Sequence, residues 1–552
     1  MAEKDRRKTR PTGTAADPAI NPLGFQKALK KQSVIRSALA MAAGTFSSRI
    51  LGFVRDAVMF ALFPRAITDA YVVAFRLPNM FRRLLGEGSL SVSFIPVYVD
   101  ARAGGEQRAR DLANAVFTIV LGVSVIVGVA GFVFMDQIIW FLVGDPQGFA
   151  AVPGKVEATI YLARIMIFYV VLVSTYAFHM AIANTLGHFF IPAIGPTLFN
   201  LGLIIFTVLP WELGRVPGST LSWGVMAGGL MQMGVVLGLL IKLGYLPVPT
   251  LRFRNPDVGK VFLNMLPGLF GLGVFQVMTV VNTMFAARLA EGAQSYIYAA
   301  DRILELPQSL IAVSLGAALL PRFSELNTAG DRGKFLAEAN QAVRMLLYLS
   351  LPAAVGMFVL AMPITQVLFM RGEFDLADAQ ATASVVEIYA VLLLFSSWSR
   401  VTAPAFYALK NTLLPAVVAF GVLILHICVG PYLVARFGLM GLAAATSVSS
   451  ILNILILQIF FYFWIGPLGY GSIGISILRL IPALGLMGLF CHYSYPFLLE
   501  LIRNHLNFYG ARTVTLSLVI TIAMVLYFGV TIFTGSEAGT RVRDIFRRRL
   551  TK

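Results

Sequence analysis

Arginines and carboxylates are concentrated in residues 48–87, whose helical segments are otherwise apolar. This stretch carries six arginines against three carboxylates, in a chain that is 58% hydrophobic and 13% charged. Arginine stays charged at every relevant pH and donates paired hydrogen bonds to phosphate or carboxylate oxygens, so such a cluster is suited to holding an anion. Charges near a bilayer centre cost about 2.5–3.5 kcal/mol each on insertion scales, and they normally face a wet interior.

Helical spacing places these charges on one face of each of two helices. The first face carries Arg49, Gly52 and Asp56, and the second carries Asp69, Arg76 and Arg83, with Asn79 and Glu87 alongside. Because Arg49 and Arg55 lie about 240° apart on an ideal helix, both reach one site only if the helix bends or the cavity wraps around it, and Gly52, which lies between them, permits a bend. The alternative is that the arginines extend to lipid headgroups or pair with neighbouring acids.

The composition is that of a polytopic membrane protein, with a mean hydropathy of +0.79 and a net charge of +17. The basic residues gather in the N-terminal arm, some loops and the C-terminal tail, which fits an anionic membrane face and not nucleic acid. Cys428 and Cys491 lie in apolar segments. The sequence has no P-loop and no HExxH or GxSxG motif, so we expect no enzymatic activity, no cofactor and no metal site.

Apolar segments predict an all-α membrane protein with about fourteen transmembrane helices of 20 residues or more. The expected helices are 34–63, 68–100, 110–142, 156–187, 191–212, 219–244, 258–290, 295–323, 335–361, 378–409, 412–435, 439–465, 473–500 and 511–534. Pro78, Pro307 and Pro404 should kink or interrupt their helices. The excess of Lys and Arg in one set of short loops places both termini in the cytoplasm and the 371–378 loop outside.

An internal repeat is expected in the first twelve helices. The segment AFHMAIANT (177–185) resembles AFYALKNT (405–412), and DAYVVAFRLP resembles SYIYAADRILELP at nearly the same offset. The repeat predicts two six-helix lobes in the same orientation. The predicted organisation is a disordered basic arm (1–33), an N-lobe (34–245), a C-lobe (246–466), helices 13 and 14 (467–535) and a basic tail (536–552).

A second charge cluster is predicted in the C-lobe, where Asp301, Arg302 and Glu305 precede Pro307. Arg302 and Glu305 can pair at i, i+3, and Asp301 and Glu305 share a face. One interpretation is an internally neutralised cluster that only packs helices. The favoured interpretation is that Arg302 meets the arginines of the first two helices between the lobes, because the repeat gives helices 2 and 8 equivalent positions.

The strings SRILGFVRDAVMFALF, TDAYVVAFRLPNMFRRLLGEGSLSVSFIP and YAADRILELPQSLIAVSLGAALLP resemble the MurJ (MviN-type) lipid II flippases of bacteria. The resemblance covers roughly residues 34–535 and places the chain in the multidrug/oligosaccharidyl-lipid/polysaccharide exporter superfamily. It implies movement of an undecaprenyl-diphosphate-linked peptidoglycan precursor from the cytoplasmic to the periplasmic leaflet of the inner membrane. Membrane lipids and the cell-wall synthesis machinery are the further partners it suggests.

The family's functional positions that match in this sequence are Ser48, Arg49, Arg55, Asp69, Arg82, Arg83, Glu87, Arg302 and Glu305. We predict that Arg49, Arg55, Arg82 and Arg302 hold the diphosphate. The supporting and gating residues are then Ser48, Asp56, Asp69, Arg83, Glu87, Asp301 and Glu305, whose acids pair with the arginines when the site is empty. Helices 13 and 14 are expected to wall a groove for the polyprenyl tail, with Phe490 and Leu498 as candidate lining.

Three rival functions stay open. A drug antiporter or another glycan-lipid exporter of the same superfamily shares the fold, but a cation exporter should use buried acids. A membrane glycosyltransferase needs a catalytic carboxylate or base on a large loop, and the loops here are short. A non-transporting scaffold would have fully paired charges. Helices 7 and 11 contain no carboxylate within their spans, so the energy source stays open.

Overall fold

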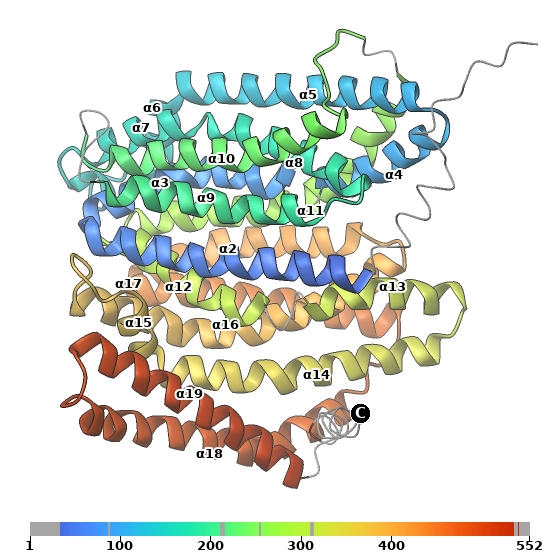
Figure 1. The fold of residues 1–552 in the computed structure, drawn as a ribbon. Helices are drawn as coiled ribbons and strands as arrows, with labels where there is room; N and C mark the ends of the chain where they lie inside the picture. The colour runs from blue at the N-terminus through green and yellow to red at the C-terminus, as the bar shows by residue number, and fades with distance from the viewer. Residues whose placement is uncertain are drawn as a thin grey trace, which may run out of the picture.

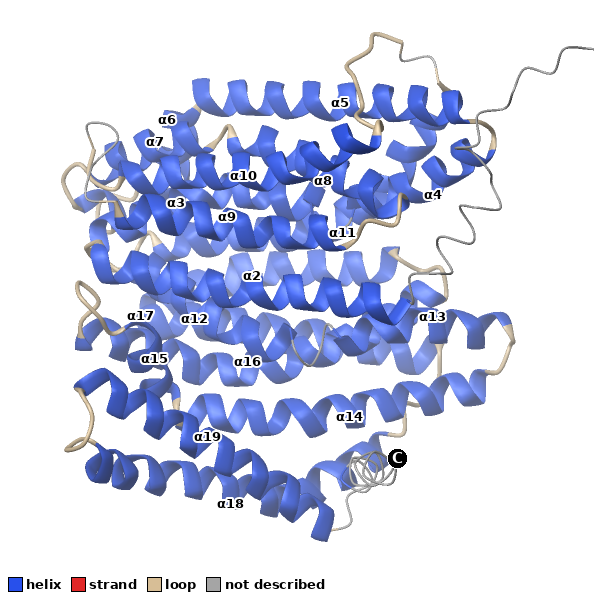
Figure 2. Cartoon of the chain, viewed as in Figure 1, coloured by secondary structure: helices blue, strands red, loops and turns tan. Residues whose placement is uncertain are grey.

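The structure is a computed structural model that describes residues 34–86, 89–209, 216–252, 255–309, 314–534 and 539. Within these residues every regular element is a helix (Figure 2). The predicted arm (1–33), nearly all of the predicted tail (536–552) and Glu87 lie outside the described residues.

The N-terminal group of helices forms the upper part of Figure 1, with α2 at its lower edge. Its elements are α2 (Val34–Leu62), α3 (Arg65–Phe81), η1 (Arg82–Gly86), α4 (Ser89–Ala103), α5 (Glu106–Val133), α6 (Met135–Val143), η2 (Phe149–Ala151), α7 (Lys155–Met166), α8 (Tyr169–Thr185), α9 (Phe190–Val208) and α10 (Ser219–Leu243). The second group is α11 (Pro256–Ala286), α12 (Ala293–Pro307), α13 (Ser314–Thr328), α14 (Arg332–Val359), α15 (Ala361–Phe369), α16 (Leu376–Ala408) and α17 (Leu413–Trp464). Two last helices, α18 (Tyr470–Ile502) and α19 (Phe508–Phe533), lie beyond α14.

Ten helices in the described part of the chain are long and apolar enough to cross a membrane, which confirms a multi-pass helical protein. Several predicted helices are divided: 68–100 contains α3, η1 and α4, and 295–323 contains α12 and α13. Conversely, α17 contains two predicted helices, 412–435 and 439–465. They meet at Gly438, whose φ of 57° and ψ of −129° are not helical. The count of fourteen spans and the internal repeat therefore stay predictions.

Two of the three prolines mark helix ends. Pro78 lies in the last turn of α3, and the chain then continues as the π-helical turn η1. Pro307 is the last residue of α12, whereas α16 runs through Pro404 as far as Ala408. A proline removes one backbone donor and clashes with the preceding turn, which favours the end of a helix. Helices α3 and α12 therefore both end close to their charged residues.

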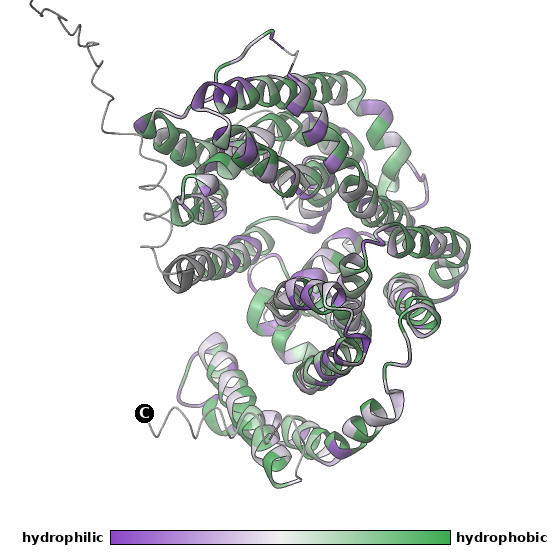
Figure 3. Ribbon diagram, turned by 90° about the vertical axis from the view of Figure 1, so that its right-hand side faces the viewer, coloured by the Kyte–Doolittle hydropathy of each residue, from purple (hydrophilic) through white to green (hydrophobic). Residues whose placement is uncertain are grey.

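Apolar side chains cover the outside of the molecule as well as its core. Figure 3 views the molecule end-on, and hydrophobic residues dominate most helices. On α18 the exposed apolar residues include Ile475, Leu478, Leu489 and Phe497. Such outward apolar faces suit a hydrocarbon solvent. One core cluster joins α14 and α15 to the last two helices through Tyr348, Leu480, Cys491, Val519 and Tyr527.

Helix α11 packs against both groups of helices. Its first half contributes Val258, Val261 and Met265 to the core around α4, α5 and α8. Its second half packs Val274 against Ala419 and Leu423 of α17. The predicted boundary at residue 246 therefore separates the chain in sequence, while α11 connects the two groups in space.

The chain enters and leaves the helical body on the same side of the molecule. Figure 1 shows α2 beginning and α19 ending at its right-hand side, which we call the N side. Helix α2 ends, and α3, α12 and α16 begin, on the opposite side. This geometry orders the charged residues described next along one axis, from the N side to the opposite side.

Candidate functional site

A buried ion pair on α2 forms the middle of the site. The Arg55 Nη2 and Nε atoms lie 2.6 and 2.8 Å from Asp56 Oδ1. The Arg55 Nη1 atom donates to Asn200 Oδ1 on α9 at 2.9 Å, and Nη2 also donates to the Tyr298 hydroxyl on α12 at 2.9 Å. The side chains of Arg55 and Asp56 are 7% and 0% exposed, so the ion pair is shielded from solvent. Such a pair is stable only when its remaining donors and acceptors are satisfied.

Arg302 connects α12 to this pair. Its Nε atom lies 3.5 Å from Asp56 Oδ2, and its Nη1 atom donates to Glu305 Oε2 at 2.5 Å. The guanidinium also stacks over the Tyr298 ring, 4.8 Å from its centroid. These distances place Arg302 beside Asp56 on α2, whereas the favoured interpretation, that Arg302 meets the arginines of the first two helices at one site, stays a prediction.

Three further residues approach Glu305 from α2 and η1. Arg83 Nη2 lies 3.5 Å from Glu305 Oε1, and Arg49 Nη1 donates to the Glu305 carbonyl oxygen at 3.5 Å. Arg82 lies within electrostatic range of Glu305 and bonds Asn79 Oδ1 at 2.9 Å. The Glu305 and Arg83 side chains are 39% and 33% exposed, so the site is accessible toward the N side and closed around Asp56.

Both Arg49 and Arg55 reach α12 without an interruption of α2. The helix is continuous from Val34 to Leu62, and a side chain at Gly52 would meet only the Asn200 amide at 3.7 Å. Asn200 also donates to the Ser48 carbonyl oxygen at 2.8 Å. No interruption of α2 is needed for both side chains to reach α12, because long arginine side chains extend to it from different faces of α2.

Among the described residues of the site, arginines outnumber carboxylates. Asp301 lies half-buried on α12, and its electrostatic partners include Arg76 on α3 and Arg302. We call the following set of described residues the central cluster: Arg49, Arg55, Asp56, Arg76, Arg82, Arg83, Asp301, Arg302 and Glu305. It contains six arginines and three carboxylates. An unbalanced positive charge inside an apolar protein favours an anionic ligand.

Asp69 lies away from the central cluster, on the opposite side of the molecule. The sequence predicts that it pairs with the arginines, but its partner is Lys155 on α7, whose Nζ atom lies 2.8 Å from Oδ2. Asp69 also accepts hydrogen bonds from the backbone N–H groups of Gly292 and Ser295 at 2.8 and 2.9 Å. A carboxylate at a helix start satisfies otherwise unpaired N–H groups and complements the positive end of the helix dipole. Asp69 thus fastens α3 to the start of α12.

A second set of contacts reinforces this connection. Arg65 at the start of α3 lies 2.6 Å from both Asp375 Oδ2 and Asp378 Oδ1 at the start of α16. The Tyr296 hydroxyl donates to Asp378 Oδ1 at 2.6 Å. Asp375 is the N-cap of α16, and backbone N–H groups together with Arg65 hold the pKa of its carboxyl below the usual range. We call the contacts of Asp69, Lys155, Gly292, Ser295, Arg65, Tyr296, Asp375 and Asp378 the interlobe latch.

Sequence reasoning missed Asn200 and Tyr298 beside the central cluster, and every residue of the interlobe latch except Asp69. Asn200 is the single amide in the apolar run FIPAIGPTLFNLGLIIFTV, and this signal could have identified it. Tyr298 lies one helical turn before Arg302, so its position on the same face of α12 could also have been predicted. Lys155 had no such signal, because it follows a loop and its side chain is buried only in the folded chain, at 1% exposure. In the part of the chain that is described, no three His, Cys, Asp or Glu side chains are grouped to hold a metal ion.

Two groups of membrane-spanning helices, joined around a buried cationic centre, have the architecture of a membrane transporter. Residues 59–495 match the family model described as lipid II flippase MurJ. The chain therefore belongs to the lipid II flippase MurJ family.

Curated relatives agree with this assignment, and solved structures share the fold. A probable lipid II flippase MurJ from Bdellovibrio bacteriovorus is 41% identical over 521 residues, covering 93% of this chain and 97% of the relative. Lipid II flippase MurJ from Burkholderia cenocepacia is 31% identical over 434 residues, covering 77% and 83%. Among solved structures, lipid II flippase MurJ in an inward closed conformation matches with a TM-score of 0.72 and 23% identity, covering 93% of this chain and 100% of that chain. An inward-facing multidrug resistance MATE family transporter matches with a TM-score of 0.66 and 14% identity, covering 77% and 96%.

Proposed function

We propose that this protein moves lipid II from the cytoplasmic to the periplasmic leaflet by alternating access, and that the central cluster holds the diphosphate. The observation that carries the proposal is the excess of three positive charges in the central cluster, contributed by α2, α3, η1 and α12. A diphosphate supplies the missing negative charge, and arginine binds its oxygens through paired hydrogen bonds. A cation exporter needs the opposite balance of charge.

When no ligand is bound, the carboxylates of the central cluster pair with the arginines that the diphosphate would otherwise contact. Asp56 and Glu305 engage Arg55, Arg83 and Arg302 when no ligand is present. An arriving diphosphate competes for the same N–H groups, so ligand binding changes which groups Arg302 connects. Because the arginines come from both helix groups, this exchange can alter how the groups are held together.

The orientation follows from the loop charges and from the accessible end of the site. We assign the N side to the cytoplasm, which places both termini there and the interlobe latch at the periplasmic face. In this arrangement Arg83 and Glu305 are accessible from the cytoplasm, while the latch closes the other side. The conformation is then the one that receives substrate.

The polyprenyl tail stays in an apolar environment while the headgroup crosses. We assign it to a surface bordered by α18 and α19, whose exposed apolar side chains include Leu489, Phe497, Leu518 and Val525. Phe490 and Leu498 are partly buried against the core that joins these helices to α14. They therefore support the wall of this surface from behind.

Translocation of labelled lipid II by the purified protein in liposomes tests the proposal. Arg302→Gln removes the charge that joins Asp56 and Glu305, and translocation should fall at least tenfold. The matched control is Arg322→Gln on α13, where the arginine pairs with Glu325 and Glu338 on the surface. Lipid II recovered from the assay should be chemically unchanged, because no enzymatic step is proposed. The proposal would be refuted if liposomes that contain the wild-type protein translocated no more lipid II than protein-free liposomes.

A further inference from the structure

A buried histidine, His426, lies near the middle of the first half of α17, outside both the central cluster and the interlobe latch. The residue is 2% exposed. It follows Leu413, where α17 begins, by thirteen residues, so it lies about 20 Å along the helix from the N side. The proposed function uses no histidine, and a titratable group at membrane depth therefore requires a separate explanation.

Both ring nitrogens of His426 have hydrogen-bond partners on neighbouring segments. The Nε2 atom lies 2.8 Å from Asn282 Oδ1 on α11, and the Nδ1 atom lies 2.9 Å from Ser449 Oγ in the second half of α17. The Phe285 ring of α11 packs beside the imidazole, with the ring centroids 5.8 Å apart. A side chain at Gly430 would come within 2.4 Å of the Phe285 ring, so this packing is tight. His426 thus joins α11 to both halves of α17.

The two partners of the ring act as acceptors, because their own hydrogens are donated elsewhere. Ser449 donates its hydroxyl hydrogen to the Ala445 carbonyl oxygen at 2.8 Å, so its oxygen accepts from Nδ1 of His426. Asn282 Nδ2 donates to Thr446 Oγ1 at 3.3 Å, which turns the amide oxygen toward Nε2. An imidazole that faces two acceptors carries hydrogen on both nitrogens, and this is its positively charged form.

The neutral imidazole does not fit this network without a rearrangement. A neutral ring has one acceptor nitrogen, so either Ser449 or Asn282 must turn to donate to it. A turn of Ser449 gives up its bond to the Ala445 carbonyl oxygen. A turn of Asn282 needs the hydroxyl hydrogen of Thr446, which is donated to the Leu442 carbonyl oxygen at 3.1 Å. Hydrogen bonds from a charged ring are also stronger than neutral ones, so protonation tightens the connection between α11 and α17.

The ligand that suits this site is a proton. A ring with hydrogen on both nitrogens has no lone pair for a metal ion. Helices α11 and α16 pack against α17, and in the described part of these three helices no charged side chain hydrogen-bonds to the imidazole. Their titratable and charged groups are Asp257 and Lys260 on α11, Asp378, Glu387, Tyr389, Arg400 and Tyr407 on α16, and Cys428, Tyr432, Arg436 and Tyr462 on α17.

Buried polar groups extend from the imidazole toward the N side. Ser397 Oγ on α16 and Asn453 Oδ1 on α17 are buried, with no hydrogen-bond partner among the described residues. Nearer the N side, Gln458 Nε2 donates to Thr402 Oγ1 at 2.7 Å, and the Tyr470 hydroxyl donates to Gln458 Oε1 at 3.1 Å. Measured from the end of α17, Asn453 and Gln458 lie about 17 and 9 Å along the helix. These groups give a proton a polar route into the second helix group.

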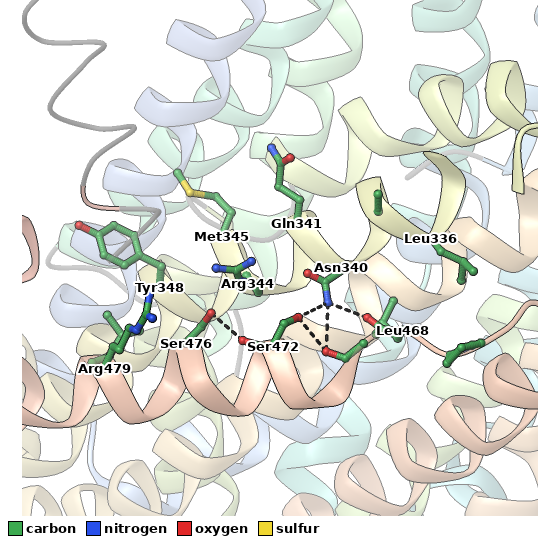
Figure 4. Close-up of a pocket in the computed structure, with 14 residues that line it drawn as sticks. Leu336, Asn340, Gln341, Arg344, Met345, Tyr348, Leu468, Ser472, Ser476 and Arg479 are labelled. Atoms are coloured by element: carbon green, nitrogen blue, oxygen red, sulfur yellow. Dashed lines mark hydrogen bonds between the residues drawn. The ribbon is translucent and has the colours of Figure 1, made fainter. Parts of the chain in front are cut away.

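The N-side end of this route is fixed in place. Tyr470 is the first residue of α18 and is 39% exposed. On either side of it in the chain, Asn340 Nδ2 of α14 donates to the Leu468 carbonyl oxygen at 2.6 Å and to Ser472 Oγ at 2.9 Å (Figure 4). The Tyr470 hydroxyl is therefore held between Gln458 and the accessible surface on the N side.

We propose that His426 is a proton-binding site of the second helix group, protonated in the conformation described here and reached from the N side. Because α11 packs against both groups of helices, release of the proton loosens the part of α11 that belongs to the second group. In a transporter that works by alternating access, this gives a proton-linked step between conformations. That consequence rests on the proposed function, whereas the proton site itself does not.

Solid-state NMR of the full chain, labelled with ¹⁵N-histidine and embedded in lipid bilayers, tests the site. The His426 signal is the one that disappears in His426→Gln. Both of its ring nitrogens should be protonated at about pH 6, and one should lose its hydrogen by about pH 9. The internal control is His179, which is 2% exposed and has no hydrogen-bond partner for either ring nitrogen among the described residues, so it should stay neutral throughout. A His426 ring that is neutral at every pH would overturn the proposal.

Substitutions of Asn282 distinguish a proton site from a structural hydrogen bond. Asn282→Leu removes one acceptor, so His426 should bind its proton at least tenfold more weakly. Asn282→Asp places a carboxylate against the ring, so the proton should bind at least tenfold more tightly. The matched control is Asn327→Asp at an exposed position on α13, which should leave the titration of His426 unchanged. Two Asn282 variants that shift the titration in the same direction, or not at all, would contradict the assignment.

Translocation of lipid II at equal pH on both sides of the liposome, from about pH 6 to 9, tests the proton-linked step. The rate of the wild type should depend on pH, and His426→Gln should remove this dependence. His492→Gln, at an exposed position on α18, should retain it. A pH profile shared by wild type and His426→Gln would refute the proton-linked step. A wild-type protein that translocates no lipid II would refute the proposed function alone, because the NMR titration decides the proton site independently.

Discussion

Arg302 on α12 lies 3.5 Å from Asp56 on α2, although the two residues are almost 250 positions apart in the chain. The same guanidinium bonds Glu305 and stacks on Tyr298. One side chain thus makes three different interactions, of which the one with Asp56 connects the two groups of helices, while Glu305 and Tyr298 lie on α12 itself. Each interaction uses a separate property of arginine: its charge, its fork of donors and its flat face.

Replacement of Arg302 by lysine should reduce lipid II translocation at least tenfold, equivalent to about 1.4 kcal/mol. A single ammonium group keeps the charge but cannot contact Asp56 and Glu305 together while stacking on Tyr298. Translocation in liposomes measures the effect, and Arg322→Lys on the surface of α13 serves as the control. Full activity of Arg302→Lys would mean that the site needs only a diffuse positive field.

Replacement of Tyr298 by phenylalanine should destabilise the protein by about 1–3 kcal/mol, because the buried hydroxyl both accepts from Arg55 and donates to Asp56. The ring that stacks on Arg302 remains, so the loss isolates the hydroxyl. Thermal unfolding in detergent measures it, with Tyr407→Phe, at an exposed position on α16, as the control. An unchanged unfolding midpoint would show that the Arg55–Asp56 pair is stable without this bridge.

The ion pairs of Asp257 should give the protein a stability contribution that is lost in acid. Asp257 begins α11 with a side chain only 4% exposed, and it accepts hydrogen bonds from Lys260 at 2.9 Å and Arg108 at 2.7 Å. These bonds lower the pKa of Asp257 below its ordinary value. A lowered folded-state pKa stabilises the fold above the unfolded pKa of about 3.9, and the contribution disappears as pH falls through the folded value.

The difference in unfolding midpoint between wild type and Asp257→Asn should therefore be constant from pH 7 to 5 and should shrink below about pH 4. Asp111→Asn, on the exposed face of α5 one turn from Arg108, is the matched control and should show no such trend. A difference in unfolding midpoint that persisted unchanged at pH 3 would mean that the charge of Asp257 contributes nothing to the stability of the protein.

Arg55 and Arg302 could be recognised from the sequence as candidates for a charged site, because charge in an apolar helix is visible at single residues, but their partners Asn200 and Tyr298 were not predicted. Helical spacing then placed Asp56, Arg302 and Glu305 on inward faces. The partners of Asp69 could not be predicted in the same way. Lys155 is 86 residues away from Asp69 in the chain. The backbone N–H groups of Gly292 and Ser295 lack a partner within their own helix only because α12 begins there. Helix boundaries are the least certain part of a sequence prediction, so an interaction with a helix end is invisible to it.

The fold was predicted at the level of its class and less well at the level of its elements. Long apolar runs such as α10 and α19 were correctly placed, because hydropathy alone defines them, whereas the predicted helix 110–142 is divided into α5 and α6 at Phe134. Helices α3 and α12 are short and carry charges, so their ends depend on proline and on packing. The role of α11 was not predicted, since nothing in its composition indicates that its two halves pack against different groups.

The loop that contains Glu373 should be accessible from outside the cell. This expectation combines the loop-charge bias with the exposure of Glu373 and its backbone bond to the Ala61 carbonyl oxygen at the end of α2. A single cysteine at Glu373, in a chain whose Cys428 and Cys491 are replaced by serine, should react with a membrane-impermeant maleimide in intact spheroplasts. A cysteine at Asp111 should react only after lysis, and the reverse pattern would invert the proposed topology.

Replacement of Asp69 by asparagine should open the interlobe latch. The substitution leaves the Lys155 ammonium buried without its carboxylate, which typically costs about 3–5 kcal/mol. Separation of the lobes on this side would let water reach Lys155 and the start of α12, so the variant should shift toward a state in which the latch is open. The second substitution Lys155→Met removes the unpaired charge and should partly restore the latched state.

The reactivity of a cysteine at Ala299 reports the state of the latch. Ala299 is 0% exposed on the face of α12 that packs against α3, so in the cysteine-free background described above it should react slowly with maleimide. Asp69→Asn should raise the rate at least tenfold, whereas Asp136→Asn should leave it unchanged, because Asp136 forms a half-exposed ion pair with Arg164 outside the latch. Equal rates in wild type and Asp69→Asn would show that the Arg65, Asp375 and Asp378 contacts suffice to keep this side closed.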